Sequence, residues 1–242
     1  MFQKVIFCFL FFFVPFNRTA VNTIANNAYL LPETTSEAPT GEQLFEEMQL
    51  QGLVNFVAFQ QAVAGYNRIK EKSKPILTLI DFSKPSTAKR FYVFDLEKKE
   101  LLYSSVVSHG RNSGENYATS FSNQNGSYKS SLGFYLTENT YKGGNGYSLI
   151  LNGLEKGIND HAKERAIVVH GAPYANPAVA ASGRLGRSLG CPALPTNLAR
   201  PIINTIKNGS VMFIYANNPN YLAHSDLLKN KKALVSATIN QL

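Results

Sequence analysis

Short strand-like runs follow one another closely after Pro75, and this spacing constrains the fold more than any other feature of the chain. The runs are rich in aromatic and β-branched residues and span 76–82, 90–96, 101–107, 133–138, 147–151, 166–169 and 211–216. A helical pattern interrupts them at 197–208, where Gly209 is the expected stop. Because strands and helices do not alternate, we predict a mainly β, mostly antiparallel domain with a few helices.

Two helical patterns precede this β-rich region. Apolar residues recur at spacings of three and four between residues 41 and 72, first at Leu44, Phe45 and Met48 and then from Phe56 onward, which predicts a helical hairpin. We therefore divide the chain into a signal peptide, a linker, a helical segment, a main domain and a C-terminal tail, with bounds at 1–25, 26–40, 41–72, 75–217 and 218–242.

The first 25 residues have the anatomy of an export signal. Lys4 provides a positive start, residues 5–16 form an apolar run, and small and polar residues follow as far as Ala25. Such a run is short for a membrane span, so we expect cleavage between Ala20 and Ala25 and export to the periplasm or cell envelope. An uncleaved N-terminal anchor is the alternative. We expect no stable membrane span once the signal is removed, because no later segment is long and apolar enough.

The charge balance suggests an acidic partner. Lys4 and Arg18 leave with the signal, which lowers the formal net charge of the 242-residue chain from +8 to +6. Cell-wall polymers, anionic lipids and nucleic acid would all suit a basic protein. The basic residues are interleaved with acidic ones, however, and the densest cluster, at 229–232, is typical of a solvated face. We therefore expect no nucleic-acid partner.

One cysteine remains after signal cleavage, because Cys8 lies within the signal. Cys191 can form no internal disulfide, and a single thiol in an exported protein indicates reactivity or intermolecular pairing. Gly190 allows the chain to turn tightly and expose the thiol, and backbone N–H groups at such a turn can hold an oxyanion. The alternative is a buried, inert cysteine, but the flanking Gly, Ser, Arg and Pro residues are typical of a loop.

A histidine at a strand end supplies the base that such a thiol requires. His170 follows the apolar run 166–169, precedes Gly171, and lies 21 residues before Cys191. A histidine near a cysteine lowers the effective pKa of the thiol and carries its proton. A lone histidine beside apolar residues is more often structural, yet together the two residues predict a cysteine–histidine catalytic site.

Other catalytic patterns fit the chain poorly. Residues 186–190 match the G-x-S-x-G nucleophile elbow, but a polar loop precedes Ser188, and the downstream His224 comes before Asp226 rather than after it. The chain has no H-E-x-x-H sequence, no cysteine pair in the mature protein and no phosphate- or dinucleotide-binding fingerprint. We therefore expect neither a metal nor a cofactor.

Several stretches, taken in order, resemble the YkuD-type L,D-transpeptidases, and in particular their murein L,D-transpeptidase catalytic domain branch. The family signature is a histidine, a spacer of mid-teens length, Ser or Thr, any residue, Gly and Cys. Here 17 residues separate His170 from Ser188. The resemblance covers about 75–217 and is carried by the stretches 81–96, 108–114, 118–137, 147–160, 166–172 and 183–195.

The resemblance implies a β-sandwich-like catalytic domain that acts on peptidoglycan stem peptides as donor and acceptor. Cys191 would attack the carbonyl of the third stem residue, release the terminal D-residue and form a thioester, which an amine or water then resolves. His170 would take and return the proton, and the carbonyl of Gly171 would orient its ring. The N–H groups of Gly190 and Cys191 would form the oxyanion hole.

The resemblance is less complete where the substrate is held. Many members have an apolar residue and then Arg or Asn after the cysteine, whereas this chain has Pro192 and Ala193. The residues that hold the substrate are therefore expected in the motif and in the loops around it. Arg184 and Arg187 could bind the substrate carboxylate, and His109 is a weaker candidate for the same role. Ser188 and Gly133, which lies at a strand start, could line the site.

Two other functions stay open at this point. A non-catalytic wall-binding module could have kept the fold, although it would need neither Cys191 nor His170. A different exported cysteine peptidase would use both residues on another substrate. The sequence does not distinguish a transpeptidase from a carboxypeptidase, because that depends on access of the acceptor to the thioester.

Overall fold

The computed structural model describes residues 38–229. The predicted signal peptide, most of the predicted linker and the last residues of the C-terminal tail lie outside this range. Two of the lysines in the basic cluster at 229–232 also lie outside it. Within the described range, no helix combines the length and the apolar character needed to cross a membrane.

The predicted helical hairpin consists of α1 (Gly41–Glu47) and α2 (Phe56–Arg68). Thr40 begins α1 through a capping box with Gln43, and the side chain of Asn55 accepts the N–H groups of Val57 and Ala58 at the start of α2. Apolar residues of both helices face inward. The ring centroids of Phe59 in α2 and Phe94 in the sheet lie 5.0 Å apart, so the hairpin packs on the β-rich part.

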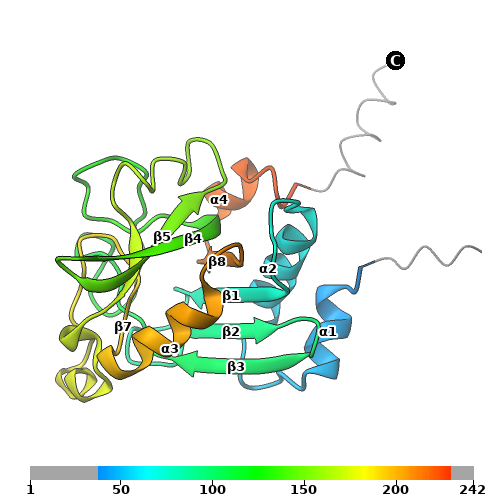
Figure 1. The fold of residues 1–242 in the computed structure, drawn as a ribbon, viewed down its shortest axis with the longest axis horizontal. Coiled ribbons are helices and arrows are strands. Elements are labelled where there is room, and N and C mark those ends of the chain that lie inside the picture. Colours follow the sequence, from blue (N-terminus) through cyan, green and yellow to red (C-terminus); the bar gives the residue numbers. More distant parts are fainter. Residues whose placement is uncertain (1–37, 230–242) are drawn as a thin grey trace, which may run out of the picture. The chain divides into compact units, whose positions relative to one another are not determined.

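Within residues 38–229, eight strands form one sheet in the order β3-β2-β1-β8-β4-β5-β6-β7 (Figure 1). Two neighbouring pairs, β1–β8 and β6–β7, are parallel and the others are antiparallel. The bounds are β1 (Ile76–Asp81), β2 (Phe91–Asp95), β3 (Glu100–Ser105), β4 (Gly133–Gly143), β5 (Gly146–Gly153), β6 (Val168–Gly171), β7 (Ala193–Leu194) and β8 (Val211–Tyr215).

The two ends of this sheet approach each other. The chain leaves β3 and forms an isolated antiparallel bridge between Ser108 and Ala193 of β7, and a second bridge joins Gly110 to Ser188. The sheet is therefore barrel-like. The prediction of a mainly β, mostly antiparallel fold with a few helices is confirmed. The sequence did not indicate β7, which has two residues.

Two further helices and two 3-10 turns complete the unit. They are η1 (Pro173–Ala175), η2 (Pro177–Ser182), α3 (Thr196–Ile206) and α4 (Pro219–His224). Helix α3 buries Ala199, Ile202, Ile203 and Ile206 and contacts β6, β1 and β5, whereas α2 contacts β1 and β8. Thus α3 corresponds to the helix predicted at 197–208.

Residues 218–229, which the sequence assigned to the C-terminal tail, pack on the folded unit. Tyr221 of α4 donates a hydrogen bond to Glu155 at 3.0 Å, and Ser225 also donates to that carboxylate. The N–H of Phe134 in β4 donates to Glu155 as well, at 2.8 Å. Burial raises the pKa of Glu155, and these donors oppose the rise by stabilising its charged form. One buried carboxylate thus ties α4 to β4.

Candidate active site

The turn that carries Cys191 depends on Gly190. Gly190 has a φ of +130°, a region that other residues rarely adopt. A Cβ at this position would lie 2.9 Å from Ile167 Cδ1 and 3.0 Å from the carbonyl oxygen of Lys129. Both the backbone angle and the crowding therefore require glycine directly before the cysteine.

Ser188 closes the same turn through its hydroxyl. Its Oγ accepts the N–H of Gly190 at 3.1 Å and donates to the carbonyl of Cys191 at 2.6 Å. The backbone of Ser188 pairs with the 109–111 segment, where it receives the N–H of Arg111 and donates to the carbonyl of His109. Ser188 is buried, so the structure gives it the role of holding the cysteine turn.

The thiol of Cys191 lies against the backbone that leads into β6. Sγ accepts the N–H of Val168 at 3.4 Å, and the S–H donates to the carbonyl of Ala166 at 3.6 Å. Burial raises the pKa of Cys191, while the N–H of Val168 and the charge of Arg165 oppose that rise. Ala166 has a φ of 52°, an uncommon conformation for a residue other than glycine.

His170 lies inside β6 rather than after it, because β6 runs to Gly171. Strand pairing places His170 opposite Ser148 of β5 on one side and Ala193 of β7 on the other. Its Nδ1 donates to the carbonyl of Gly171 at 3.1 Å, the contact that the family resemblance implies, which leaves Nε2 as the proton acceptor. Burial lowers the pKa of His170, so the ring is neutral at pH 7.

The parallel pairing of β6 with β7 brings the histidine and cysteine segments side by side. Cys191 precedes Ala193 by two residues, and Ala193 is the register partner of His170. Within residues 38–229 no hydrogen bond joins Cys191 to His170, since the thiol points to Ala166 instead. The arrangement supplies a buried thiol, a neutral base and a backbone orienter in adjacent segments.

One N–H of the expected oxyanion hole is already engaged. The N–H of Gly190 donates to Ser188 Oγ, whereas that of Cys191 has no hydrogen-bond acceptor in the described part of the chain. The free Cys191 N–H is therefore the donor best placed to meet an oxyanion.

Arg184 and Arg187 are held by one carboxylate. The Nε of Arg184 lies 2.9 Å from one oxygen of Glu115, and an Nη of Arg187 lies 2.6 Å from the other. Arg187 also donates to the carbonyls of Arg111 and Gly114. The two arginines thus do come together, and an exposed side-chain carboxylate bridges them.

His109 differs from its predicted role. Its side chain is fully buried, with Nδ1 2.8 Å from a guanidinium nitrogen of Arg90 and Nε2 3.2 Å from the carbonyl of Gly114. Burial, together with the charge of Arg90, lowers the pKa of His109 to about 4. A buried neutral imidazole cannot bind a substrate carboxylate, so His109 organises the loop instead.

Gly133 also differs from its predicted role. It has a φ of +97°, and a Cβ there would lie 2.3 Å from Oε2 of Glu155. Gly133 is therefore the point at which β4 passes close to the buried carboxylate of Glu155, which also binds α4. This position gives Gly133 no exposed surface to line a substrate site.

The sequence did not indicate Arg165, whose guanidinium lies close to the cysteine turn. One of its nitrogens lies 3.5 Å from the position that a Cβ of Gly190 would occupy. It hydrogen-bonds to the carbonyls of Ser122 and Lys129 and to the hydroxyl of Ser131. The only sequence signal is its place directly before the 166–169 run, which does not by itself indicate a contact with residues 122–131.

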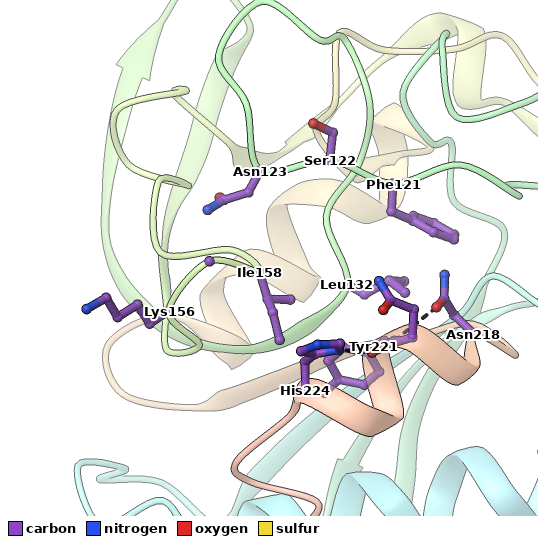
Figure 2. A pocket seen from close by; sticks show the side chains of 11 residues that line it. Phe121, Ser122, Asn123, Leu132, Lys156, Ile158, Asn218, Tyr221 and His224 are labelled. Carbon is purple, nitrogen blue, oxygen red and sulfur yellow. Dashed lines mark hydrogen bonds between the residues drawn. The ribbon is translucent and has the colours of Figure 1, made fainter.

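Two of the cavities in the described part of the protein differ in their distance from the cysteine turn along the fold, because only one is lined by residues that hold the thiol. One of about 490 Å³ is lined in part by Ala166, Ile167 and Val168, the residues whose backbone holds the thiol, and by an ion pair of 2.7 Å between Glu138 and Lys163. Another of about 410 Å³ lies between the 121–123 loop and α4, where Figure 2 shows His224 and Tyr221 below Ile158 and Leu132.

A comparison with models of protein families identifies one family. A family model described as the L,D-transpeptidase catalytic domain matches residues 50–215. A comparison with curated proteins finds no match. Similar solved structures include an L,D-transpeptidase from Mycobacterium smegmatis, with 14% identity over 59% of each chain and a TM-score of 0.36.

Two further solved structures are similar. L,D-transpeptidase 3 from Mycobacterium tuberculosis has 15% identity, covers 59% of this chain and 61% of its own, and gives a TM-score of 0.38. The helical cell shape determining protein Pgp2 from Campylobacter jejuni has 15% identity, covers 75% of this chain and 58% of its own, and gives 0.40. This chain thus spans about three fifths of the length of these proteins.

Proposed function

The chain belongs to the L,D-transpeptidase catalytic domain family, and from that premise we propose that it is an exported enzyme that acts on peptidoglycan stem peptides through a thioester on Cys191. The observation that carries this proposal is the pairing of β6 with β7. It brings the thiol turn beside His170, whose Nδ1 is committed to Gly171 and whose Nε2 is free to accept a proton.

The first half of the reaction forms the thioester. The thiol turns from Ala166 toward His170, and its proton passes to Nε2. The thiolate attacks the carbonyl carbon of the third stem residue, and the negative charge that develops on the carbonyl oxygen meets the N–H of Cys191. The bond to the terminal D-residue then breaks, and its nitrogen takes the proton from His170.

The second half resolves the thioester. An amine of a second stem loses a proton to His170 and attacks the thioester carbonyl, which forms the new amide and breaks the bond to sulfur. The thiol recovers its proton from His170. Water in place of the amine gives carboxypeptidase action by the same steps.

The surroundings of the thiol support an extended substrate. The cavity of about 490 Å³ is lined in part by Ala166 and Val168, whose backbone groups hydrogen-bond to Sγ, and we propose that part of the stem peptide lies there. Arg184 and Arg187 are proposed to bind the substrate carboxylate by exchanging it for Glu115, which is 72% exposed and therefore free to move away.

The test uses the purified protein with muropeptides that carry tetrapeptide stems, and mass spectrometry follows the products. We expect cross-linked dimers and released D-amino acid with the wild type, and neither with Cys191→Ala. His170→Ala should lose at least a hundredfold in rate, whereas His161→Ala, which changes a half-exposed histidine, should react like the wild type.

The products separate the remaining possibilities. Tripeptide stems without dimers would establish carboxypeptidase action. Binding to peptidoglycan without any product that depends on Cys191 would contradict the enzyme proposal and favour a wall-binding module. Export is tested separately, by locating the protein in cell fractions with and without residues 1–25.

A further inference from the structure

The guanidinium of Arg165 is a half-buried cation that lacks an acidic partner among the described residues. Its hydrogen bonds go to neutral oxygens, namely the carbonyls of Ser122 at 2.7 Å and Lys129 at 2.6 Å and the hydroxyls of Ser131 at 2.5 Å and Ser127 at 3.4 Å. Within residues 38–229, no carboxylate forms an ion pair with it. Arg165 is half-buried, so its positive charge is incompletely compensated.

The segment that Arg165 holds is the one that packs on the cysteine turn. Between Lys129 and Ser131, whose oxygens Arg165 binds, lies Ser130, which donates through Oγ to the carbonyl of Gly190 at 3.0 Å. Ser130 Oγ in turn accepts the N–H of Gly110. Gly190 is thus enclosed by Ile167, the carbonyl of Lys129 and the guanidinium of Arg165. A shift of this arginine would move the residue next to the nucleophile.

The other ionisable groups around the thiol do not supply a positive charge. Burial lowers the pKa of His170, and His109 is neutral for the same reason. Burial raises the pKa of Tyr174 to about 12, and the negative charge of Cys191 adds to the rise. Lys129 reaches the site with its backbone carbonyl. Arg165 is the cation whose charge lowers the pKa of Cys191.

We propose that Arg165 is a positioning residue for the nucleophile, which stabilises the Cys191 thiolate by its unpaired charge and fixes the cysteine turn through the 129–131 segment. Burial disfavours the thiolate, so a cation at this place offsets the cost of ionisation before substrate arrives. This role refines the proposed function, but it concerns the ionisation of the thiol and not the identity of the substrate.

The test measures the rate at which iodoacetamide alkylates Cys191 as a function of pH. Arg165→Gln should move the midpoint of the profile to higher pH and lower the rate at pH 7 about fivefold to tenfold. Arg165→Lys keeps the charge and should keep the midpoint, although its ammonium cannot bind three oxygens in the fork that Arg165 uses. Unchanged midpoints in both variants would overturn the proposal.

Arg68→Gln is the matched control, because Arg68 also donates to two backbone carbonyls, those of Leu227 and Lys229. Its profile should equal that of the wild type. A purely structural role for Arg165 would change the fraction of folded protein without moving the midpoint, and that outcome also contradicts the proposal.

A second measurement uses the wild type alone, so it tests the proposal even if Arg165→Gln does not fold. A cation beside the thiolate attracts an anionic reagent. The ratio of alkylation rates with iodoacetate and iodoacetamide should therefore exceed that of N-acetylcysteine by about threefold or more at low salt, and the excess should shrink as salt is added. A ratio equal to that of the free thiol would overturn the proposal. Alkylation needs no peptidoglycan, so this result is independent of the muropeptide assay.

Discussion

At the scale of the residue, the site depends on where single groups are buried. The thiol of Cys191 and the ring of His170 are both buried, and burial raises the pKa of the former and lowers the pKa of the latter. Both groups therefore rest in their neutral forms at pH 7. Transfer of the proton from sulfur to nitrogen converts this neutral pair into an ion pair, and the proposed reaction needs that step first.

Gly190→Ala tests the requirement for glycine before the nucleophile. The new Cβ would meet atoms at 2.9 and 3.0 Å and would force a residue with a side chain into a φ of +130°. We expect a loss of about 3 kcal/mol in the free energy of unfolding, measured with urea. Gly183→Ala is the matched control, because Gly183 has a φ of +94° but nothing within 4 Å. Its loss should be about 1 kcal/mol, and equal losses would show that crowding at Gly190 is unimportant.

His109→Asn tests the acid sensitivity of the fold. The pKa of His109 is about 4 in the native protein, against an ordinary value of 6.5 in the unfolded chain. As pH falls from 6.5 toward 4, the unfolded chain takes up the proton first, so native stability declines by about 3 kcal/mol across this window. Asn offers Arg90 an acceptor in place of Nδ1 and does not titrate.

Urea midpoints between pH 7 and pH 4 should therefore fall less steeply for His109→Asn than for the wild type. His161→Asn, at a half-exposed position, should keep the wild-type slope. Parallel slopes for all three proteins would mean that His109 does not contribute to the acid response.

At the scale of the element, the helical hairpin is fixed to the sheet by a close approach. Gly65 of α2 faces Phe134 of β4, and a Cβ there would lie 2.0 Å from the tip of that ring. The ring stacks on Phe213 of β8, with centroids 4.2 Å apart. A glycine that is poor for the helix is thus required by packing between α2 and two central strands.

Helix propensity and packing predict opposite effects of Gly65→Ala on the free energy of unfolding. Helix propensity alone predicts a gain of about 1 kcal/mol. The clash with Phe134 predicts a net loss of about 2 kcal/mol, because the ring is enclosed and α2 must move away from the sheet. Ala64→Gly, at the exposed neighbouring position, should lose about 1 kcal/mol and calibrates the propensity. A stabilised Gly65→Ala protein would refute the packing argument.

At the scale of the whole unit, contacts between distant parts of the chain close the structure. β8 inserts between β1 and β4, and the 108–110 segment after β3 bridges to residues 188 and 193. Glu155 joins β4 to α4, and Arg68 of α2 donates to the carbonyls of Leu227 and Lys229. Residues near the C-terminal end of the described range therefore hold β4 and α2 in place.

Truncation tests this long-range support. A chain that ends after Ala216 loses the buried Tyr221 and leaves the carboxylate of Glu155 with only the N–H of Phe134. We expect a loss of about 4 kcal/mol in the free energy of unfolding. A chain that ends after Lys229 keeps α4 and its contacts and should unfold at a higher urea concentration than the chain that ends after Ala216. Similar midpoints for the two truncated chains would contradict the role of α4.

The sequence by itself determined the class of fold, and it predicted the pair Cys191 and His170 that the proposed function uses. Strand and helix periodicities are local, and the spacing of the pair follows a family pattern, so both can be predicted from the sequence. Tertiary structure alone decided that β8 pairs in parallel with β1, that His109 is buried, that Gly133 faces Glu155 and that Arg165 reaches the cysteine turn. Each of these depends on contacts between residues far apart in the chain, which local patterns do not encode.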